Sequence, residues 1–147
     1  MIYTRVELLA IGNWAVEHDI LILADDIYGR LVYNGNEFVP ISSLSEAIRK
    51  QTIVINGLSK SHAMTGWRLG YIAAPADIMK TIQKVNAFLV TSVTDNVQAA
   101  AIEALNKGQA DPLEARKIYE DRLKFMKTGL EKLGFEMYAT RSLLYFC

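Results

Sequence analysis

The chain has 147 residues, 51% of them hydrophobic, and its 16 Lys and Arg balance its 16 Asp and Glu. This composition suits one domain with a sizeable core, and the zero net charge gives no support for nucleic acid or an anionic membrane as a partner. Cys147 is the single cysteine, which excludes a disulfide within the chain, and no apolar run is long enough to span a membrane. We expect a cytoplasmic protein.

A helix is predicted close to the start of the chain. Thr4 and Glu7 have the spacing of a capping box, in which the two side chains accept hydrogen bonds from each other's backbone N–H groups. Apolar residues then recur at helical spacing. We expect this helix to end near residues 18–19, with His18 at a helix C-terminus, where a cation is favoured.

Two unbroken apolar runs, residues 20–24 and 52–55, predict strands. Continuous apolarity indicates a strand that is buried on both faces, as in a parallel sheet. Asp25 and Asp26 follow the first run, and a loop with Lys60 follows the second. Because ligands in open α/β sheets gather beyond the carboxyl ends of strands, these residues are candidates for a site. The alternative for at least one aspartate is a helix N-cap.

Further elements follow from hydrophobic periodicity and from turn residues. The candidate strands lie at residues 31–33, 69–74, 135–138 and 143–146, and the candidate helices lie at residues 45–49, 76–89, 97–105 and 112–133. Gly108 and Gly134 are predicted to close the last two helices. Strands that alternate with helices predict an α/β layered domain.

The segment 56–71 contains Lys60 and, eight residues later, Arg68, among three glycines. A lysine amine forms Schiff bases, and the fork of a guanidinium binds phosphate. This pair suits an aldehyde cofactor that carries a phosphate. The alternative is that Lys60 is a solvated surface residue and that Arg68 belongs to an ion pair.

Other conspicuous side chains are assigned structural roles. We interpret His62, Met64 and Trp67 as residues that pack or line the loop. Tyr33 is expected to face solvent or a partner subunit, and Gln98 to contact backbone near the start of its helix. No Cys and His cluster has the spacing of metal ligands, so no metal site is expected.

Three motifs together carry a family resemblance: Asp25-Asp26-Ile27-Tyr28, Ser59-Lys60 and Gly66-Trp67-Arg68-Leu69-Gly70. The chain resembles the class I and II aminotransferases, which are fold-type-I pyridoxal-phosphate enzymes, and is most similar to their bacterial aspartate aminotransferase-like branch. The resemblance covers nearly the whole chain. It implies a three-layer α/β/α large domain that runs into a small α+β domain. Residues 1–108 would be the C-terminal part of the cofactor-binding large domain, 109–134 an interdomain helix and 135–147 the start of the small domain.

The resemblance also implies a role for each matched residue. Lys60 would hold pyridoxal 5'-phosphate as an aldimine and move a proton between substrate and cofactor. Asp25 would face the pyridine nitrogen and keep it protonated, which makes the ring a better electron sink. Tyr28 would hydrogen-bond the phenolic oxygen. Arg68 would clamp the phosphate, and Ser59 would add a hydroxyl.

The implied reaction transfers an amino group between an amino acid, with aspartate or an aromatic one expected, and a 2-oxo acid, in a homodimer. A carbon–sulfur lyase of the same fold is one alternative, and a cofactor-binding or dimerising piece without turnover is another. The family's second phosphate-binding loop, ring-stacking aromatic residue and carboxylate-binding arginine have no counterpart in this sequence. Ser142 stands where the family has glycine. We therefore expect a fragment that does not catalyse transamination by itself.

Overall fold

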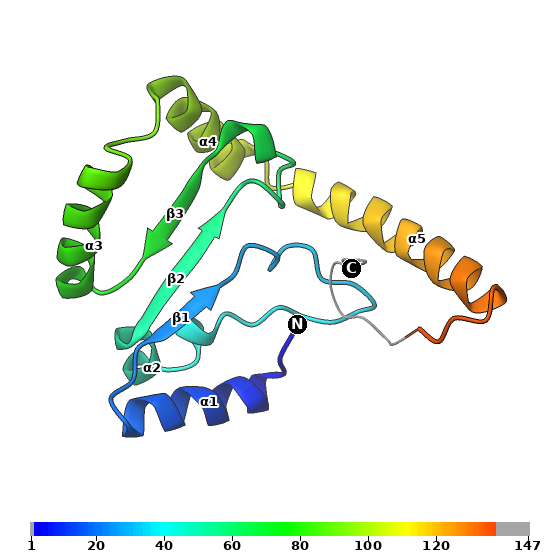
Figure 1. The fold of residues 1–147 in the computed structure, drawn as a ribbon, viewed down its shortest axis with the longest axis horizontal. Helices are drawn as coiled ribbons and strands as arrows, with labels where there is room; N and C mark the ends of the chain where they lie inside the picture. The colour runs from blue at the N-terminus through cyan, green and yellow to red at the C-terminus, as the bar shows by residue number, and fades with distance from the viewer. Residues whose placement is uncertain (1, 138–147) are drawn as a thin grey trace.

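The structure is a computed structural model that describes residues 2–137. Within this range, three strands and five α-helices follow one another (Figure 1). Their bounds are α1 Arg5–Glu17, β1 Ile22–Asp25, α2 Glu46–Lys50, β2 Thr52–Gly57, β3 Gly70–Ala73, α3 Ala76–Leu89, α4 Asp95–Lys107 and α5 Asp111–Lys132, and short 3-10 helices lie at Ile41–Ser43 and Thr65–Trp67. The predicted α/β class is therefore correct.

The strands form one mixed sheet in the order β1-β2-β3. The predicted parallel pair is present, because β1 runs parallel to β2 with Asp25 opposite Ile55. β3 runs antiparallel to β2 with Gly57 opposite Gly70. Because β1 and β2 point the same way, the segments that follow Asp25 and Gly57 emerge at the same edge of the sheet, which we call the carboxyl edge.

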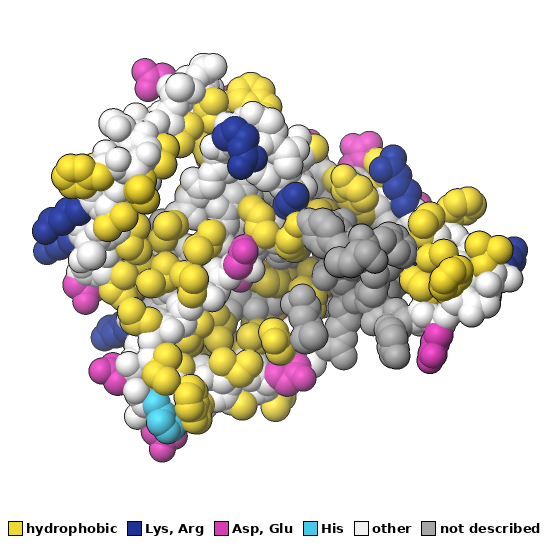
Figure 2. All heavy atoms as spheres, in the orientation of Figure 1, with side chains coloured by type: hydrophobic (Ala, Val, Ile, Leu, Met, Phe, Trp, Pro, Cys, Tyr) yellow, Lys and Arg dark blue, Asp and Glu magenta, His cyan; other side chains and the backbone are white. Residues whose placement is uncertain are grey.

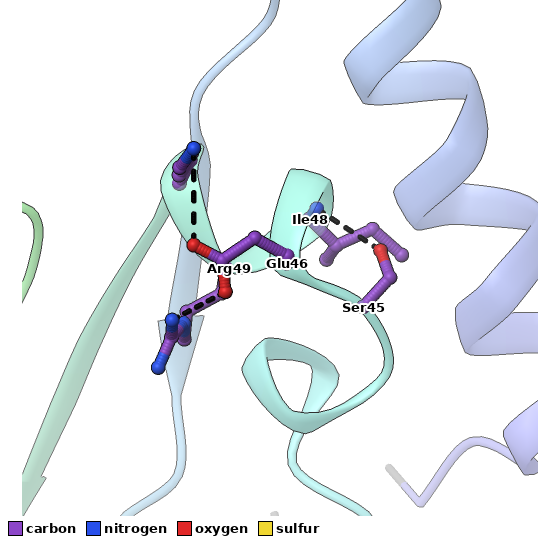
Figure 3. Close-up of polar contacts among 5 residues, drawn as sticks. Ser45, Glu46, Ile48 and Arg49 are labelled. Atoms are coloured by element: carbon purple, nitrogen blue, oxygen red, sulfur yellow. Dashed lines mark hydrogen bonds and ion pairs between the residues drawn. The ribbon is translucent and has the colours of Figure 1, made fainter.

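Local capping fixes the ends of α1, as predicted, and the start of α2. The Glu7 carboxylate accepts the backbone N–H of Thr4 at 2.6 Å, and the Thr4 hydroxyl accepts that of Glu7 at 3.3 Å. α1 ends at Glu17, and His18 is its C-cap. In α2 the Ser45 hydroxyl accepts the backbone N–H of Ile48 at 3.2 Å, while Glu46 pairs with Arg49 one turn on (Figure 3).

The helices α1 and α2 pack closely against each other. Ile48 is 0% exposed. A Cβ added to Gly12 of α1 would lie 2.5 Å from Ile48 Cδ1, so a larger residue at this position would force the Ile48 side chain to shift. Thr52 at the start of β2 is also buried and donates its hydroxyl to the Ile48 carbonyl at 2.7 Å.

The prediction of a strand at residues 31–33 was wrong. Val32 forms an isolated bridge, and the chain turns at once, with left-handed φ values of 57° at Asn34 and 70° at Gly35. The expectation that Tyr33 faces solvent or a partner was also wrong, because Tyr33 is 1% exposed, and Leu31 and Val32 are buried with it. Three apolar residues before a tight turn are too few for a ladder, and they pack into the core instead.

The sheet is more open than the apolar runs predicted. β1 alternates half-buried and exposed residues, and Leu23 is 66% exposed. Leu23 lines a hollow of about 340 Å³ together with Leu8 and Ile11 of α1. Every residue of β3 is exposed. Figure 2 shows hydrophobic side chains gathered over the sheet on the face in view. In the described part of the chain, the sheet therefore lacks the cover on both faces that continuous apolarity indicates.

The later helices match their predictions closely. α3 has the predicted bounds, and α4 and α5 differ by one or two residues at each end. Gly108 is the C-cap of α4, and Gly134 follows the α5 C-cap with a φ of 88°. Residues 135–137 form no strand, and the predictions for 138 and 143–146 lie outside the described residues. Among residues 2–137, no helix is long and apolar enough to cross a membrane.

Candidate functional site

The turn after β1 begins at the carboxyl edge with Asp25, the last residue of the strand. Its Oδ1 accepts the backbone N–H of Ile27 at 3.2 Å, so the side chain stabilises the chain reversal that follows. Residues 27–30 form a turn and no helix, and the predicted N-cap alternative is therefore replaced by this turn contact. The Asp25 side chain remains exposed and available to a ligand.

Three of the five predicted site residues line one hollow of about 270 Å³ at this edge. They are Asp25, Ser59 and Arg68, which come from the turn after β1, the loop after β2 and the approach to β3. Asn56, Leu69 and Gly70 complete much of the wall. The hollow therefore offers a carboxylate, a hydroxyl and a guanidinium to the same small volume.

The other two predicted residues, Lys60 and Tyr28, contact each other. Lys60 Nζ lies 5.7 Å from the centroid of the Tyr28 ring, within the range of a cation–π interaction. Both side chains are half-buried. Lys60 follows Ser59 directly, and Tyr28 lies three residues after Asp25. The pair therefore joins the same two loops that border the hollow.

Arg68 reaches the hollow from a constrained backbone. Its φ is 52°, in the left-handed region, and its Nη1 donates to the Thr65 carbonyl at 2.8 Å. Ala63 in the same loop has a φ of 53°. Each such non-glycine residue raises the free energy of the fold by about 1–2 kcal/mol, and this kind of strain clusters at ligand sites.

Glycine closes the junction beside the hollow. A Cβ on Gly57 would lie 2.9 Å from the Leu69 carbonyl oxygen and 3.2 Å from Gly70 Cα. These are backbone atoms at the start of β3 and just before it, and they cannot move aside easily. Gly57 therefore lets the end of β2 and the start of β3 meet next to Arg68.

Asp26 differs from its neighbour in its surroundings. It is half-buried and lines the hollow between α1 and β1. Burial raises the pKa of the Asp26 carboxyl above its usual 3.8, and the nearby charge of Asp25 raises it further. The two adjacent aspartates therefore occupy different environments, and Asp25 alone belongs to the hollow with Arg68.

Two residues acquire importance only in the structure. Asn56 lines the hollow, and its Oδ1 accepts the backbone N–H of Gly57 at 2.7 Å. An amide that ends an apolar strand is the sequence signal that would have found it. His62 bonds to the Ser61 hydroxyl and to the Gly108 carbonyl, and no local pattern predicts a partner 46 residues away.

Neither Gln98 nor Trp67 lines the hollow with Asp25, Ser59 and Arg68. Gln98 Nε2 donates to the Val93 carbonyl at 2.6 Å, near the start of α4 as expected. Trp67 lies in the short 3-10 helix before Arg68 and is 46% exposed. Within residues 2–137, no group of three or more His, Cys, Asp or Glu is placed to hold a metal ion.

Comparison with known proteins gives a consistent result. The family model for aminotransferase class I and II matches residues 1–147. The chain is 50% identical to the asparagine–oxo-acid transaminase of Streptococcus mutans, over 99% of this chain and 37% of that protein. It is 44% identical to an aspartate aminotransferase of Bacillus sp. strain YM-2, over the same shares of the two chains.

Solved structures show the same likeness. An aromatic aminotransferase from Pyrococcus horikoshii OT3 superimposes with a TM-score of 0.88 at 31% identity, over 95% of this chain and 38% of that one. The chain thus spans little more than a third of the length of the proteins that it matches.

Proposed function

The chain belongs to the aminotransferase class I and II family and has its aspartate aminotransferase-like fold, and on this premise we propose that it is the cofactor-holding part of a longer aminotransferase. The proposed reaction transfers an amino group between an amino acid and a 2-oxo acid, with aspartate or an aromatic amino acid as donor. The observation that carries the proposal is the shared hollow of Asp25, Ser59 and Arg68 beside the Lys60–Tyr28 pair.

The side chains at the carboxyl edge fit pyridoxal 5'-phosphate by their chemistry. The molecule has an aldehyde, a phenolic oxygen, a basic ring nitrogen and a phosphate. This edge offers an amine, a phenol, a carboxylate and a guanidinium, and a hydroxyl in the hollow supplements the guanidinium. When bound, the cofactor supplies an electron sink for the carbon that loses its proton.

Each of the five candidate residues has a defined role in the proposed function. The Lys60 amine attaches the cofactor and later carries a proton to and from the substrate carbon. The Asp25 carboxylate accepts the ring N–H and, through its negative charge, favours the protonated ring. The Tyr28 hydroxyl donates to the phenolic oxygen, and Arg68 and Ser59 donate to the phosphate.

The domain boundaries remain part of the proposal. We place residues 1–108 in the large domain, 109–134 in an interdomain helix and 135–147 at the start of the small domain. α5 supports the middle assignment, because it extends away from the sheet as one continuous helix (Figure 1). We further propose that the longer enzyme is a cytoplasmic homodimer and that these 147 residues alone do not catalyse transamination.

A trapping experiment tests the cofactor assignment on this chain. The chain is incubated with pyridoxal 5'-phosphate and reduced with borohydride, and the modified lysines are identified by peptide mass spectrometry. We expect Lys60 to be the preferred lysine and Lys60→Ala to abolish the preferred modification. Lys50→Ala is the matched control, because Lys50 lies at the opposite end of β2 and pairs with Glu46. Modification spread evenly over the lysines would refute the assignment.

The roles of charge and shape are tested in the longer enzyme. Asp25→Asn should retain cofactor binding but lose most of the turnover, because an amide cannot stabilise the ring proton through charge. Arg68→Lys should weaken cofactor affinity more than it slows the reaction, because a point charge replaces a fork. Near-normal turnover of Asp25→Asn with aspartate and 2-oxoglutarate would show that Asp25 does not serve the ring nitrogen.

A further inference from the structure

The two loops that carry the candidate cofactor residues are both tied to the junction between α4 and α5. The loop after β2 reaches Gly108 through His62, and the turn after β1 reaches Gln109 through Arg30. We propose that this junction is a brace and that His62 is the positioning residue that holds Lys60 against Tyr28, with Arg30 in a supporting role. This inference rests on the proposed function in that Lys60 is taken to be the attachment residue.

His62 makes two hydrogen bonds through its ring. Its Nε2 lies 3.1 Å from the Gly108 carbonyl oxygen, and its Nδ1 lies 2.8 Å from the Ser61 hydroxyl. A carbonyl only accepts, so Nε2 carries the proton. In the neutral ring Nδ1 then accepts from the Ser61 hydroxyl, whose alternative acceptor is the Gly57 carbonyl at 3.5 Å. Ser61 is buried, at 6% exposed. The ring therefore bridges a buried hydroxyl in the lysine loop and a backbone oxygen 46 residues along the chain.

Arg30 makes the matching contact from the other loop. Its Nη2 donates to Gln109 Oε1 at 3.3 Å. Arg30 is exposed, so this bond contributes less than the half-buried one made by His62. The two loops nevertheless reach consecutive residues, the turn after β1 reaching Gln109 and the loop after β2 reaching Gly108.

The receiving end of the brace is itself fixed. The Gly108 N–H donates to the Ala104 carbonyl at 3.0 Å, and the Gly108 carbonyl also accepts from Asp111 N–H at 3.3 Å. A Cβ on Gly108 would lie 2.8 Å from the Ala104 carbonyl oxygen, so glycine is required for this turn. Pro112, in the first turn of α5, is buried. The junction therefore offers a rigid acceptor rather than a mobile loop.

Both residues that contact the junction lie close in sequence to the Lys60–Tyr28 pair. His62 lies two residues after Lys60, and Arg30 lies two residues after Tyr28. Both loops are therefore anchored close to the pair in which Lys60 Nζ lies 5.7 Å from the Tyr28 ring centroid. Loss of the His62 bond frees one side of that pair while leaving the core around Ile48 untouched.

The test uses pairs of variants that separate the two ring nitrogens. Gln places an amide nitrogen near the position of Nε2, and Asn places one near that of Nδ1. We expect His62→Phe to lower preferred Lys60 trapping by pyridoxal 5'-phosphate several-fold, His62→Gln to restore most of it and His62→Asn to restore little. His18→Phe is the matched control, because the other histidine of the chain bonds to Trp14 at the far end of α1. It should leave trapping unchanged.

Amide hydrogen exchange gives a second readout that does not depend on the cofactor. Exchange at residues 60–64 should speed up in His62→Phe and return toward normal in His62→Gln. If Lys60 of the unmodified chain shows no preferred trapping, the proposed function fails, and exchange alone decides the brace. Gln and Asn variants that behave alike, or unchanged exchange in His62→Phe, would overturn the inference. If His62→Phe does not fold, the Gln and Asn pair still decides it.

Discussion

The two ends of β1 and β2 differ in what their residues do. At the amino ends, Gly12 of α1 packs directly against the fully buried Ile48 of α2, and capping bonds fix the helices. At the carboxyl edge the side chains of Asp25 and Arg68 are exposed and the backbone is strained. The amino ends of these two strands therefore stabilise the fold. At the carboxyl edge, the backbone is strained and the polar side chains remain exposed.

This division agrees with a general trade-off between stability and function. A ligand site needs groups that the protein itself does not satisfy fully. Such groups contribute little to folding, and the packing elsewhere must offset them. The comparison predicts that changes at the amino end alter stability and spare cofactor attachment, whereas changes at the carboxyl edge do the reverse.

The largest change in the free energy of unfolding is expected at the amino ends of β1 and β2, where α1 packs against α2. Ile48→Ala should lower the free energy of unfolding by about 2–5 kcal/mol, because it leaves a cavity in a fully buried place. Phe88→Ala on α3 is the control, because Phe88 is 92% exposed, and it should change that free energy by about 0.5 kcal/mol or less. Urea denaturation measures both. Equal effects would show that α3 is packed as tightly as α2.

A smaller effect is expected where packing leaves a polar group unsatisfied. The Tyr33 hydroxyl is buried and has no hydrogen-bond partner among the described residues. Burial, with Tyr119 and Glu120 nearby, raises the pKa of Tyr33 to about 12. Tyr33→Phe should therefore stabilise the fold by about 1 kcal/mol. Tyr71→Phe, at a 40% exposed position, should have no measurable effect on thermal unfolding. A destabilised Tyr33→Phe would reveal a bond to this hydroxyl.

At the carboxyl edge, the effect of backbone strain on stability should be separable from the effect of the Arg68 cation on cofactor binding. Ala63→Gly and Arg68→Gly both relieve a left-handed φ, and the greater freedom of unfolded glycine offsets part of the gain, so Ala63→Gly should stabilise the fold by about 1 kcal/mol or less. Arg68→Gly should gain less, because it also loses the hydrogen bond to the Thr65 carbonyl. Only Arg68→Gly removes a cation. We expect it alone to weaken binding of pyridoxal 5'-phosphate, measured by titration. Equal loss in both variants would assign the effect to loop shape.

The smallest effect depends on pH. The pKa of Asp26 is raised in the folded chain, so its stabilising contribution is complete below its usual value of 3.8 and is lost as pH rises through the raised value. The stability of Asp26→Asn relative to the unmodified chain should therefore increase across that window and then level off. Asp25→Asn removes the charge that raises the Asp26 pKa by the smaller amount. The pH range over which the stability changes should therefore become narrower. A difference that is constant with pH, measured by urea denaturation, would contradict this.

Short-range information sufficed for much of this molecule. Thr4 with Glu7 fixed the start of α1, periodicity fixed the bounds of α3, and the apolar runs located β1 and β2. These features depend on residues a few positions apart, and their physics is visible in the order of the amino acids. The family motifs likewise named Lys60 and Arg68 without any structure.

Contacts between distant residues were decided only by the tertiary structure. The burial of Tyr33, the antiparallel direction of β3, the approach of Lys60 to Tyr28 and the bond from His62 to Gly108 depend on where separate segments meet. These long-range contacts cannot be predicted from the local sequence, because they result from the packing of all the segments together. The sequence thus determined the local elements and named the chemical groups of the candidate site, and the packed fold determined which groups face one another.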